Sequence, residues 1–186
     1  MPFGLGFFAT AGASAPAGSF DLLETQVLTG SQASITFSNL TTNYASTYKH
    51  LQIRFTARSN RAAVNSNLTY QINGVSSNSY AVHFLAGSGT SVFSAAATGY
   101  FGYITEYLPA ASTASNIYAG GVIDLLDPFE STKNKVIRAS VATNSSIQLV
   151  SGLLQDTTSI TSFALVDNLA QLVSGTRVSL YGIKGS

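Results

Sequence analysis

Apolar and polar residues alternate most regularly over residues 48–61, which have the sequence YKHLQIRFTARSNR. The apolar residues share one parity: Leu51, Ile53, Phe55 and Ala57. The other parity is polar and basic: His50, Gln52, Arg54, Thr56 and Arg58. Successive side chains of a β-strand point to opposite faces. The stretch therefore predicts a long strand with one buried face and one cationic face.

Shorter alternations recur along the chain and predict about ten strands in all. The further strands are expected at residues 20–28, 33–37, 68–72, 80–84, 100–107, 117–126, 135–143, 147–154, 160–165 and 177–183. No segment repeats apolar residues at the helical period, so little helix is expected. The pattern predicts one all-β domain over residues 20–186, a jelly-roll-like antiparallel β-sandwich. An immunoglobulin-like arrangement is disfavoured because the strands are too many and a Cys–Trp–Cys pattern is missing.

Turn residues predict how some of these strands are connected. Asn73 and Gly74 form a strong tight-turn dipeptide, which predicts a hairpin between residues 68–72 and 80–84. Residues 86–98 are rich in Gly, Ser and Ala and are expected to form a loop, with at most a short strand at Val92 and Phe93. Other loops are expected at residues 39–47 and 110–116, and a single helical turn is compatible with residues 127–130.

Residues 1–19 precede the predicted domain and are apolar and rich in small residues. The segment has no Lys or Arg at its start, and glycines interrupt its apolar run, so it is a poor signal peptide and too short to span a membrane. It predicts a short extended N-terminal arm. The arm carries four large apolar residues that would anchor it to a partner: Phe3, Leu5, Phe7 and Phe8.

The protein has few charged residues with which to cover its surface. Charged residues make up 9% of the chain and hydrophobic residues 45%, against a typical charged share of about 25%. Low charge removes a usual guard against self-association, so the composition favours an assembled protein. The net charge of +1 argues against general binding to nucleic acid or to acidic membranes. There are no cysteines, which excludes disulfides and thiolate metal sites.

The few charges are unevenly distributed along the sequence. Between Thr25 and Thr105 every charged residue is basic, and between Glu106 and Glu130 every charged residue is acidic. This pattern predicts charge pairing of Arg54 and Arg58 with Glu106, Asp124 and Asp127. The pairs could form within the chain, between neighbouring segments, or between subunits, where a basic patch meets an acidic one.

No constellation in the sequence points to catalysis, a metal or a cofactor. His50 and His83 lie on predicted strands, and no nucleophile elbow accompanies them. Asp124, Asp127 and Glu130 are too widely spaced for a typical Ca²⁺ loop, and Gly87 to Gly89 lack the Lys-Ser/Thr of a phosphate loop. The sequence therefore predicts a protein that is not an enzyme and has no cofactor.

Aromatic residues cluster in and beside the predicted strand 100–107. Tyrosine rings at a sheet edge can pack against a partner chain or stack on sugars. Tyr100, Tyr103 and Tyr107 are therefore candidate contacts with another subunit or with a glycan.

Two long stretches and the leader carry a family resemblance. The front half contains SFDLLETQVLTGSQASITFSNL and TYKHLQIRFTARSNR, the tail contains SGLLQDTTSITSFALVDN and SGTRVSLYGIKGS, and the leader begins MPFGLGFFATAGA. In these segments the chain resembles small virion structural proteins of tailed bacteriophages. Where that group typically has a tryptophan after SGL, this chain has Leu154.

The resemblance implies a β-sandwich located in the virion and assembled in the bacterial host cytoplasm. It implies a capsid decoration (cement) protein that binds and stabilises the head shell as an oligomer. The expected partners are further copies of the chain, as a homotrimer or alternatively a dimer, and the major capsid protein or another virion protein. The alternative is a tail-fibre or tail-tip module that contacts host glycans through loops 86–98 and 110–116. A free carbohydrate-binding or hydrolytic domain is a third, weaker hypothesis.

Overall fold

The computed structural model describes residues 19–185 of the chain. Over this range the backbone forms twelve strands and one five-residue helix. In chain order they are β1 (Phe20–Val27), β2 (Ser34–Phe37), α1 (Leu40–Tyr44), β3 (His50–Ala57), β4 (Asn65–Ile72), β5 (Tyr80–Ser88), β6 (Ser91–Gly99), β7 (Gly102–Pro109), β8 (Ala119–Leu126), β9 (Lys135–Ala142), β10 (Ser146–Leu154), β11 (Phe163–Asp167) and β12 (Arg177–Ile183). The predicted all-β class is confirmed. The anchor residues proposed for the N-terminal arm lie outside the described residues.

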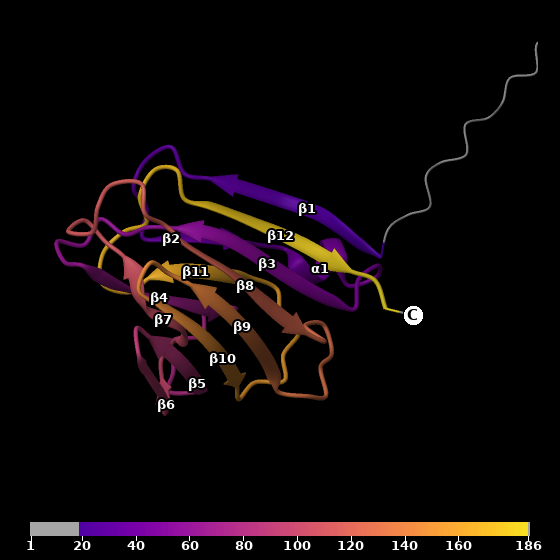
Figure 1. Ribbon diagram of the computed structural model, residues 1–186. Helices are drawn as coiled ribbons and strands as arrows, with labels where there is room; N and C mark the ends of the chain where they lie inside the picture. The colour runs from indigo at the N-terminus through magenta and orange to yellow at the C-terminus, as the bar shows by residue number, and fades with distance from the viewer. Residues whose placement is uncertain (1–18, 186) are drawn as a thin grey trace, which may run out of the picture.

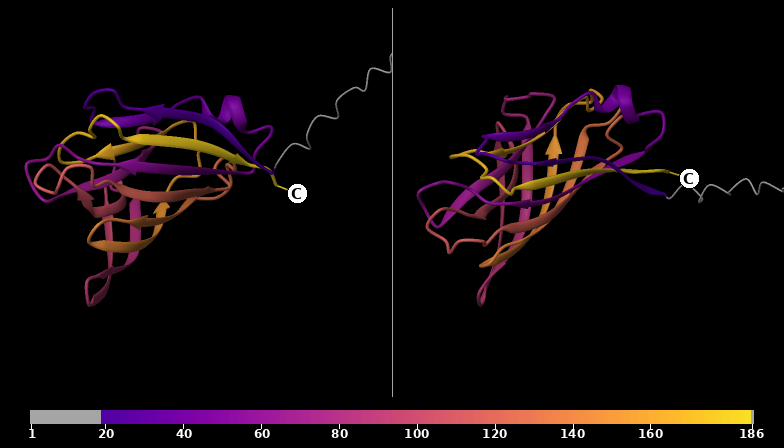
Figure 2. Two further views of the ribbon diagram at one scale, coloured as in Figure 1. Left: turned by 45° about the horizontal axis from the view of Figure 1, so that its top comes forward. Right: turned by 90° about the horizontal axis from the view of Figure 1, so that it is seen from above.

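The strands form two antiparallel sheets that pack face to face (Figures 1 and 2). The larger sheet has eight strands in the order β1-β12-β3-β8-β9-β10-β5-β6, and the smaller has four in the order β2-β11-β4-β7. A single cluster of buried apolar side chains fills the space between them. Because the larger sheet has twice as many strands, its edge strand β6 lies beyond the smaller sheet, whose strand β7 still packs on β5.

The pairing order is that of a jelly roll, as the sequence predicts. The first strand pairs with the last, β1 with β12, and the pairs β2–β11, β3–β8 and β4–β7 follow inward along the chain. A chain folded back on itself in this way and wound into two sheets is the eight-stranded double Greek key. Two further pairs of strands, β5–β6 and β9–β10, are inserted into this frame and widen only the larger sheet.

The regular alternation at residues 48–61 forms β3, in the middle of the larger sheet between β12 and β8. Its apolar residues are almost completely buried in the core: Leu51, Ile53, Phe55 and Ala57. Its polar residues point to the opposite face, which the smaller sheet does not cover: His50, Gln52, Arg54 and Thr56. The predicted division into a buried and a polar face is confirmed for the strand, which ends at Ala57.

The predicted hairpin across Asn73 and Gly74 is wrong. Both residues have positive φ, at 52° and 69°, and the turn is closed by the Val75 N–H donating to Ile72 O at 2.9 Å. However, β4 belongs to the smaller sheet and β5 to the larger one, so the turn carries the chain between sheets. The Asn73 side chain fixes this crossing, since its Oδ1 accepts the N–H groups of Thr161 and Ser162 just before β11.

The prediction of a loop at residues 86–98 is also wrong. β5 continues to Ser88, and after a two-residue turn at Gly89 and Thr90 the chain returns as the nine-residue strand β6. Residues 39–47, predicted as a loop, contain α1, whereas residues 127–130 form a turn and no helix. No helix among residues 19–185 is long and apolar enough to cross a membrane.

Candidate functional site

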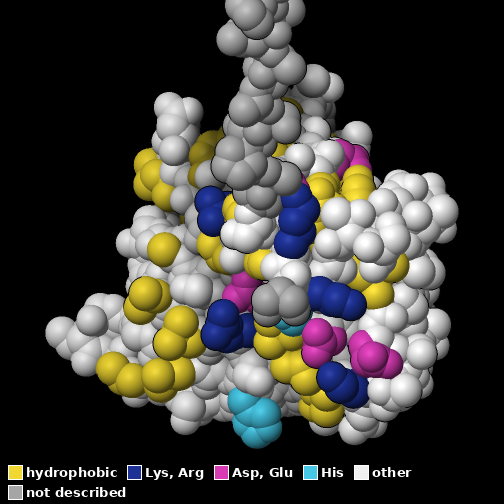
Figure 3. Space-filling view, turned by 90° about the vertical axis from the view of Figure 1, so that its right-hand side faces the viewer, with side chains coloured by type: hydrophobic (Ala, Val, Ile, Leu, Met, Phe, Trp, Pro, Cys, Tyr) yellow, Lys and Arg dark blue, Asp and Glu magenta, His cyan; other side chains and the backbone are white. Residues whose placement is uncertain are grey.

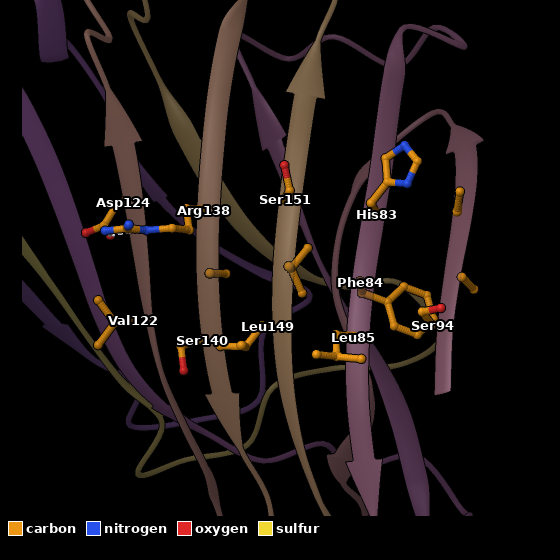
Figure 4. A pocket seen from close by; sticks show the side chains of 14 residues that line it. His83, Phe84, Leu85, Ser94, Val122, Asp124, Arg138, Ser140, Leu149 and Ser151 are labelled. Carbon is orange, nitrogen blue, oxygen red and sulfur yellow. Dashed lines mark hydrogen bonds and ion pairs between the residues drawn. The ribbon is translucent and has the colours of Figure 1, made fainter. Parts of the chain in front are cut away.

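The face of the eight-stranded sheet that points away from the smaller sheet, here called the outer face, is the main candidate surface. Strand registers place its side chains in rows that run across the sheet. One row, the leucine row, contains Arg54, Val122, Ser140, Leu149, Leu85 and Ser94. The next, the charged row, contains Gln52, Asp124, Arg138, Ser151, His83 and Ala96. Between β8 and β6 the two rows line a groove of about 920 Å³ (Figure 4).

Large apolar side chains on the outer face remain open to solvent. Leu85 and Leu149 are 48% and 53% exposed, although each lies on a strand that is paired on both sides. Rows on either side add three further exposed apolar residues: Leu126, Val136 and Ile147. Exposed Leu22 on β1 lies in the charged row, beyond Tyr181 and Gln52. Contiguous apolar surface of this kind marks interaction sites in folded proteins. Burying it would yield roughly 25 cal/mol for each Å² removed from water.

The charged row contains a connected set of polar contacts across three strands. Arg138 on β9 donates to Asp124 Oδ2 on β8 through Nη2 at 2.8 Å and Nε at 3.2 Å (Figure 4). Gln52 on β3 donates to the other carboxylate oxygen at 2.8 Å, and Arg54 Nε donates to Gln52 Oε1 at 2.9 Å. Asp124 is therefore satisfied within the chain, and its cationic partner is Arg138, which the sequence did not single out.

Arg54 lies at the β1 side of the outer face, among aromatic rings. Its guanidinium carbon is 5.1 Å from the ring centroids of both Phe20 and Tyr181. These two rings are themselves stacked at 4.9 Å. Cation–π contacts of this type contribute on the order of 0.5–1 kcal/mol at exposed sites. Arg54 therefore helps to hold edge strand β1 against β12 and β3.

Arg58 does not lie on the outer face, contrary to the sequence prediction. The chain leaves the sheet after Ala57, and the Arg58 residue is 8% exposed. Its guanidinium donates to three backbone carbonyls of one loop, those of Thr113, Ala114 and Ile117, at 2.8–3.0 Å. Arg58 thus organises the 113–117 loop and has no carboxylate partner among the described residues.

The predicted charge pairing within the chain is wrong. No ion pair within residues 19–185 joins Arg54 or Arg58 to Glu106, Asp124 or Asp127. Asp127 instead pairs with Lys133 at 3.2 Å and lies beside His50, whose Nδ1 accepts the Asp127 N–H. These residues lie at one end of the sandwich, where charged side chains gather beside apolar ones (Figure 3). Pairing between subunits stays a prediction.

The three tyrosines are placed differently from one another. Tyr103 packs inward on Phe84, with ring centroids 5.1 Å apart, and its hydroxyl accepts the Glu106 N–H at 3.0 Å. Burial raises the pKa of Tyr103 to about 12. This placement argues against Tyr103 as a glycan or partner contact. Tyr100 is 60% exposed and follows β6 directly, so it remains a candidate, as does the partly exposed Tyr107.

A buried carboxylate, Asp167, was missed by the sequence reasoning. It accepts hydrogen bonds from the hydroxyls of Ser59 and Ser66 and from the N–H groups of Leu169 and Ala170. All its contacts are internal, and the residue is 3% exposed. Its role is to tie the end of β11 to the β3–β4 connection. No group of three or more potential metal ligands occurs in the described part of the chain.

Comparison with known proteins adds no family assignment. No model of a known protein family matches the chain, and no curated protein is similar to it in sequence.

Proposed function

We propose that the protein is a structural subunit of a tailed-phage virion, a decoration or cement protein that binds the head shell as an oligomer. The observation that carries the proposal is the outer face, a wide sheet surface with exposed leucine, isoleucine and valine side chains on its strands β8, β9, β10 and β5. Jelly rolls occur in viral capsid proteins and also in lectins, so the fold agrees with the proposal without deciding it.

Surface chemistry supports an assembly role. The leucine row and the charged row, from β3 to β6, contain only three residues of the types Lys, Arg, Asp and Glu. Asp124 and Arg138 form an ion pair with one another, and Arg54 lies at the β3 end. A face with so few charges is better suited to contact with another protein surface than to exposure to solvent. A cement protein acts by adding such buried area between neighbouring shell subunits, and many copies multiply the effect.

The N-terminal arm extends this argument. β1 is an edge strand, and its first residue, Phe20, stacks on Tyr181 at the border of the outer face. The sequence immediately before it is apolar and contains Phe3, Leu5, Phe7 and Phe8. We expect the arm to attach the subunit to the shell or to a neighbouring subunit.

Co-sedimentation with phage heads that lack the protein tests the proposal. The purified protein is expected to bind, and the double variant Leu85→Asp/Leu149→Asp is expected to lose binding while its folding is retained. Deletion of residues 1–19 should have the same effect. Val64→Asp is a matched control, because Val64 is 58% exposed but lies in the β3–β4 connection. Undiminished binding of the double variant and of the deletion variant would count against the proposal.

The alternative, a tail-fibre or tail-tip module that binds host glycans, is favoured by one observation. The groove combines apolar side chains with hydroxyl, imidazole and guanidinium groups from Ser140, Ser151, His83 and Arg138 (Figure 4). Sugars are bound by surfaces that offer both kinds of contact. Binding of the isolated protein to a glycan array, abolished by Arg138→Ala, would favour this alternative.

A further inference from the structure

Strand β6 is the open edge of the larger sheet. It pairs with β5 on one side and ends the strand order, so its other side has no strand partner among the described residues. Seven of its nine residues are exposed, from Ser91 to Thr98 with the exception of Phe93. An edge strand of this length presents a row of unpaired N–H and C=O groups.

The devices that usually prevent edge pairing are missing from β6. It contains no charged residue and no proline, and its pairing with β5 runs through nine positions without a bulge. The opposite edge of the same sheet, β1, carries Asp21 and Glu24 and has a register shift between Leu22 and Glu24. Natural sheets use charges, prolines and bulges to protect their edges. Only one of the two edges of this sheet is protected in that way.

We propose that β6 pairs with β6 of a second copy of the chain, antiparallel, across a two-fold axis at Ala95. The two eight-stranded sheets then become one continuous sheet with both outer faces on the same side. This inference does not depend on the virion function, because it follows from the edge itself.

Backbone geometry permits this pairing without disturbing the existing hairpin. In a hairpin with a two-residue turn, the flanking pair Ser88–Ser91 exchanges hydrogen bonds, and alternate pairs then do the same. Residues 93, 95 and 97 therefore direct their backbone groups to β5. The groups of Val92, Ser94, Ala96 and Thr98 point away from β5 and are available to a second strand.

Side chains also fit this register. With the axis at Ala95, Phe93 lies opposite Ala97 of the second copy, Val92 opposite Thr98, and Ser94 opposite Ala96. The one large side chain, Phe93, meets a small one, the other pairs are of similar size, and no like charges meet. Phe93 already packs edge-on against Phe84 at 6.1 Å, so the second copy would cover its open side.

A second copy suits this edge better than the other free edge of the sheet. Pairing β6 with β1 of another copy would bring a regular strand against the bulge after Leu22. It would also place Asp21, which is bonded to Lys184 and Tyr48, beside an uncharged strand. In a two-fold dimer both β6 strands are paired with one another, so no unpaired β6 edge remains. No third chain can therefore be added at β6.

Cross-linking through an introduced cysteine tests the proposal, and the cysteine-free chain gives a clean background. At the axis, two Ala95 residues form a non-hydrogen-bonded pair with Cα atoms about 4.5 Å apart, which is within the range of a disulfide. Ala95→Cys is expected to give a disulfide-linked dimer on mild oxidation, reversed by reductant. Thr98→Cys is the control, because its two copies would be about 20 Å apart. Absence of the Ala95→Cys dimer, or equal cross-linking of Thr98→Cys, would overturn the proposal.

A proline variant provides an independent check. Ala96→Pro in the Ala95→Cys background removes an N–H that points away from β5, so the hairpin should survive and the cross-link should be lost. Ala96→Lys should act in the same way through charge repulsion and guards against misfolding of the proline variant. Cross-linking that persists in the folded Ala96→Lys protein would show a different interface, such as one formed by the N-terminal arm or by β1.

Discussion

Leu85 of β5 and Leu149 of β10 lie directly opposite one another on the outer face, and about half of each residue is exposed. A cross-strand pair of leucines on strands that are paired on both sides is usually covered by a second layer. Here the smaller sheet covers only the other face. The pair therefore marks the surface that the assembled protein is expected to bury.

Neighbouring residues on β10 should respond to different extents to the same substitution. Leu149→Asp is expected to lower the free energy of unfolding by only about 1 kcal/mol, since Leu149 points outward and loses mainly its cross-strand contact with Leu85. Val150→Asp should cost several kcal/mol, because Val150 is 4% exposed and a carboxylate there has no partner. Denaturant unfolding of both variants measures this contrast. Equal destabilisation would mean that the outer face is already covered.

Tyr70 is expected to stabilise the protein when its hydroxyl is removed. The hydroxyl is buried and has no hydrogen-bond partner within residues 19–185. Tyr70→Phe should therefore raise the free energy of unfolding by about 1 kcal/mol. Tyr80→Phe is the contrasting variant, because the Tyr80 hydroxyl accepts the Ile72 N–H at 2.9 Å, and its loss should be destabilising. A destabilising Tyr70→Phe would point to a partner for this hydroxyl.

Two glycines make room for Tyr70 in the core. A Cβ at Gly152 would collide with the Tyr70 hydroxyl, whereas a Cβ at Gly102 would collide with its ring carbons. Gly152→Ala and Gly102→Ala should each cost about 1–3 kcal/mol, the usual range for overpacking. Tyr70→Phe should rescue Gly152→Ala, since the nearest remaining ring carbon is 3.4 Å away, but should not rescue Gly102→Ala. Thermal unfolding of the single and double variants tests this difference.

Acid should loosen edge strand β1 through Asp21. Hydrogen bonds from Lys184 and Tyr48 hold the pKa of Asp21 below its ordinary value. A carboxylate with a lowered pKa stabilises the fold above its ordinary pKa, and this contribution is lost as the pH falls through the lowered value. Asp21→Asn should therefore be less stable than the native protein near neutral pH, and the difference should vanish in acid. Hydrogen exchange of β1 amides at several pH values would measure it, and a difference independent of pH would contradict it.

The alternation of apolar and polar residues predicted most strands of the jelly roll. The two-residue period of a strand can be recognised in the sequence without knowing which strands it pairs with. Leu51, Ile53 and Phe55 are buried as expected. The strand β6 was not predicted, because Ser94 to Ala97 are all small and show no alternation of apolar and polar residues. These residues form a strand because they pair with β5. The turn at Asn73 was recognised, but local turn geometry does not determine which sheet the next strand joins.

The candidate site was harder to predict than the fold. In β10, apolar residues occupy both parities, with Leu149 outside and Val150 inside, while polar Gln148 is buried. Because apolar residues occur on both faces of β10, the sequence could have predicted an apolar patch on the outer face. Arg58 was misplaced because the strand ends one residue earlier, where the backbone turns toward Pro109 and Val173.

The number of copies of this chain in purified phage particles tests the central claim most directly. Quantitative mass spectrometry, referenced to the major capsid protein, would provide the count. A decoration protein repeated over the shell predicts on the order of hundreds of copies per particle. A few to tens of copies would favour the tail alternative, and absence of the chain from the particles would contradict the account.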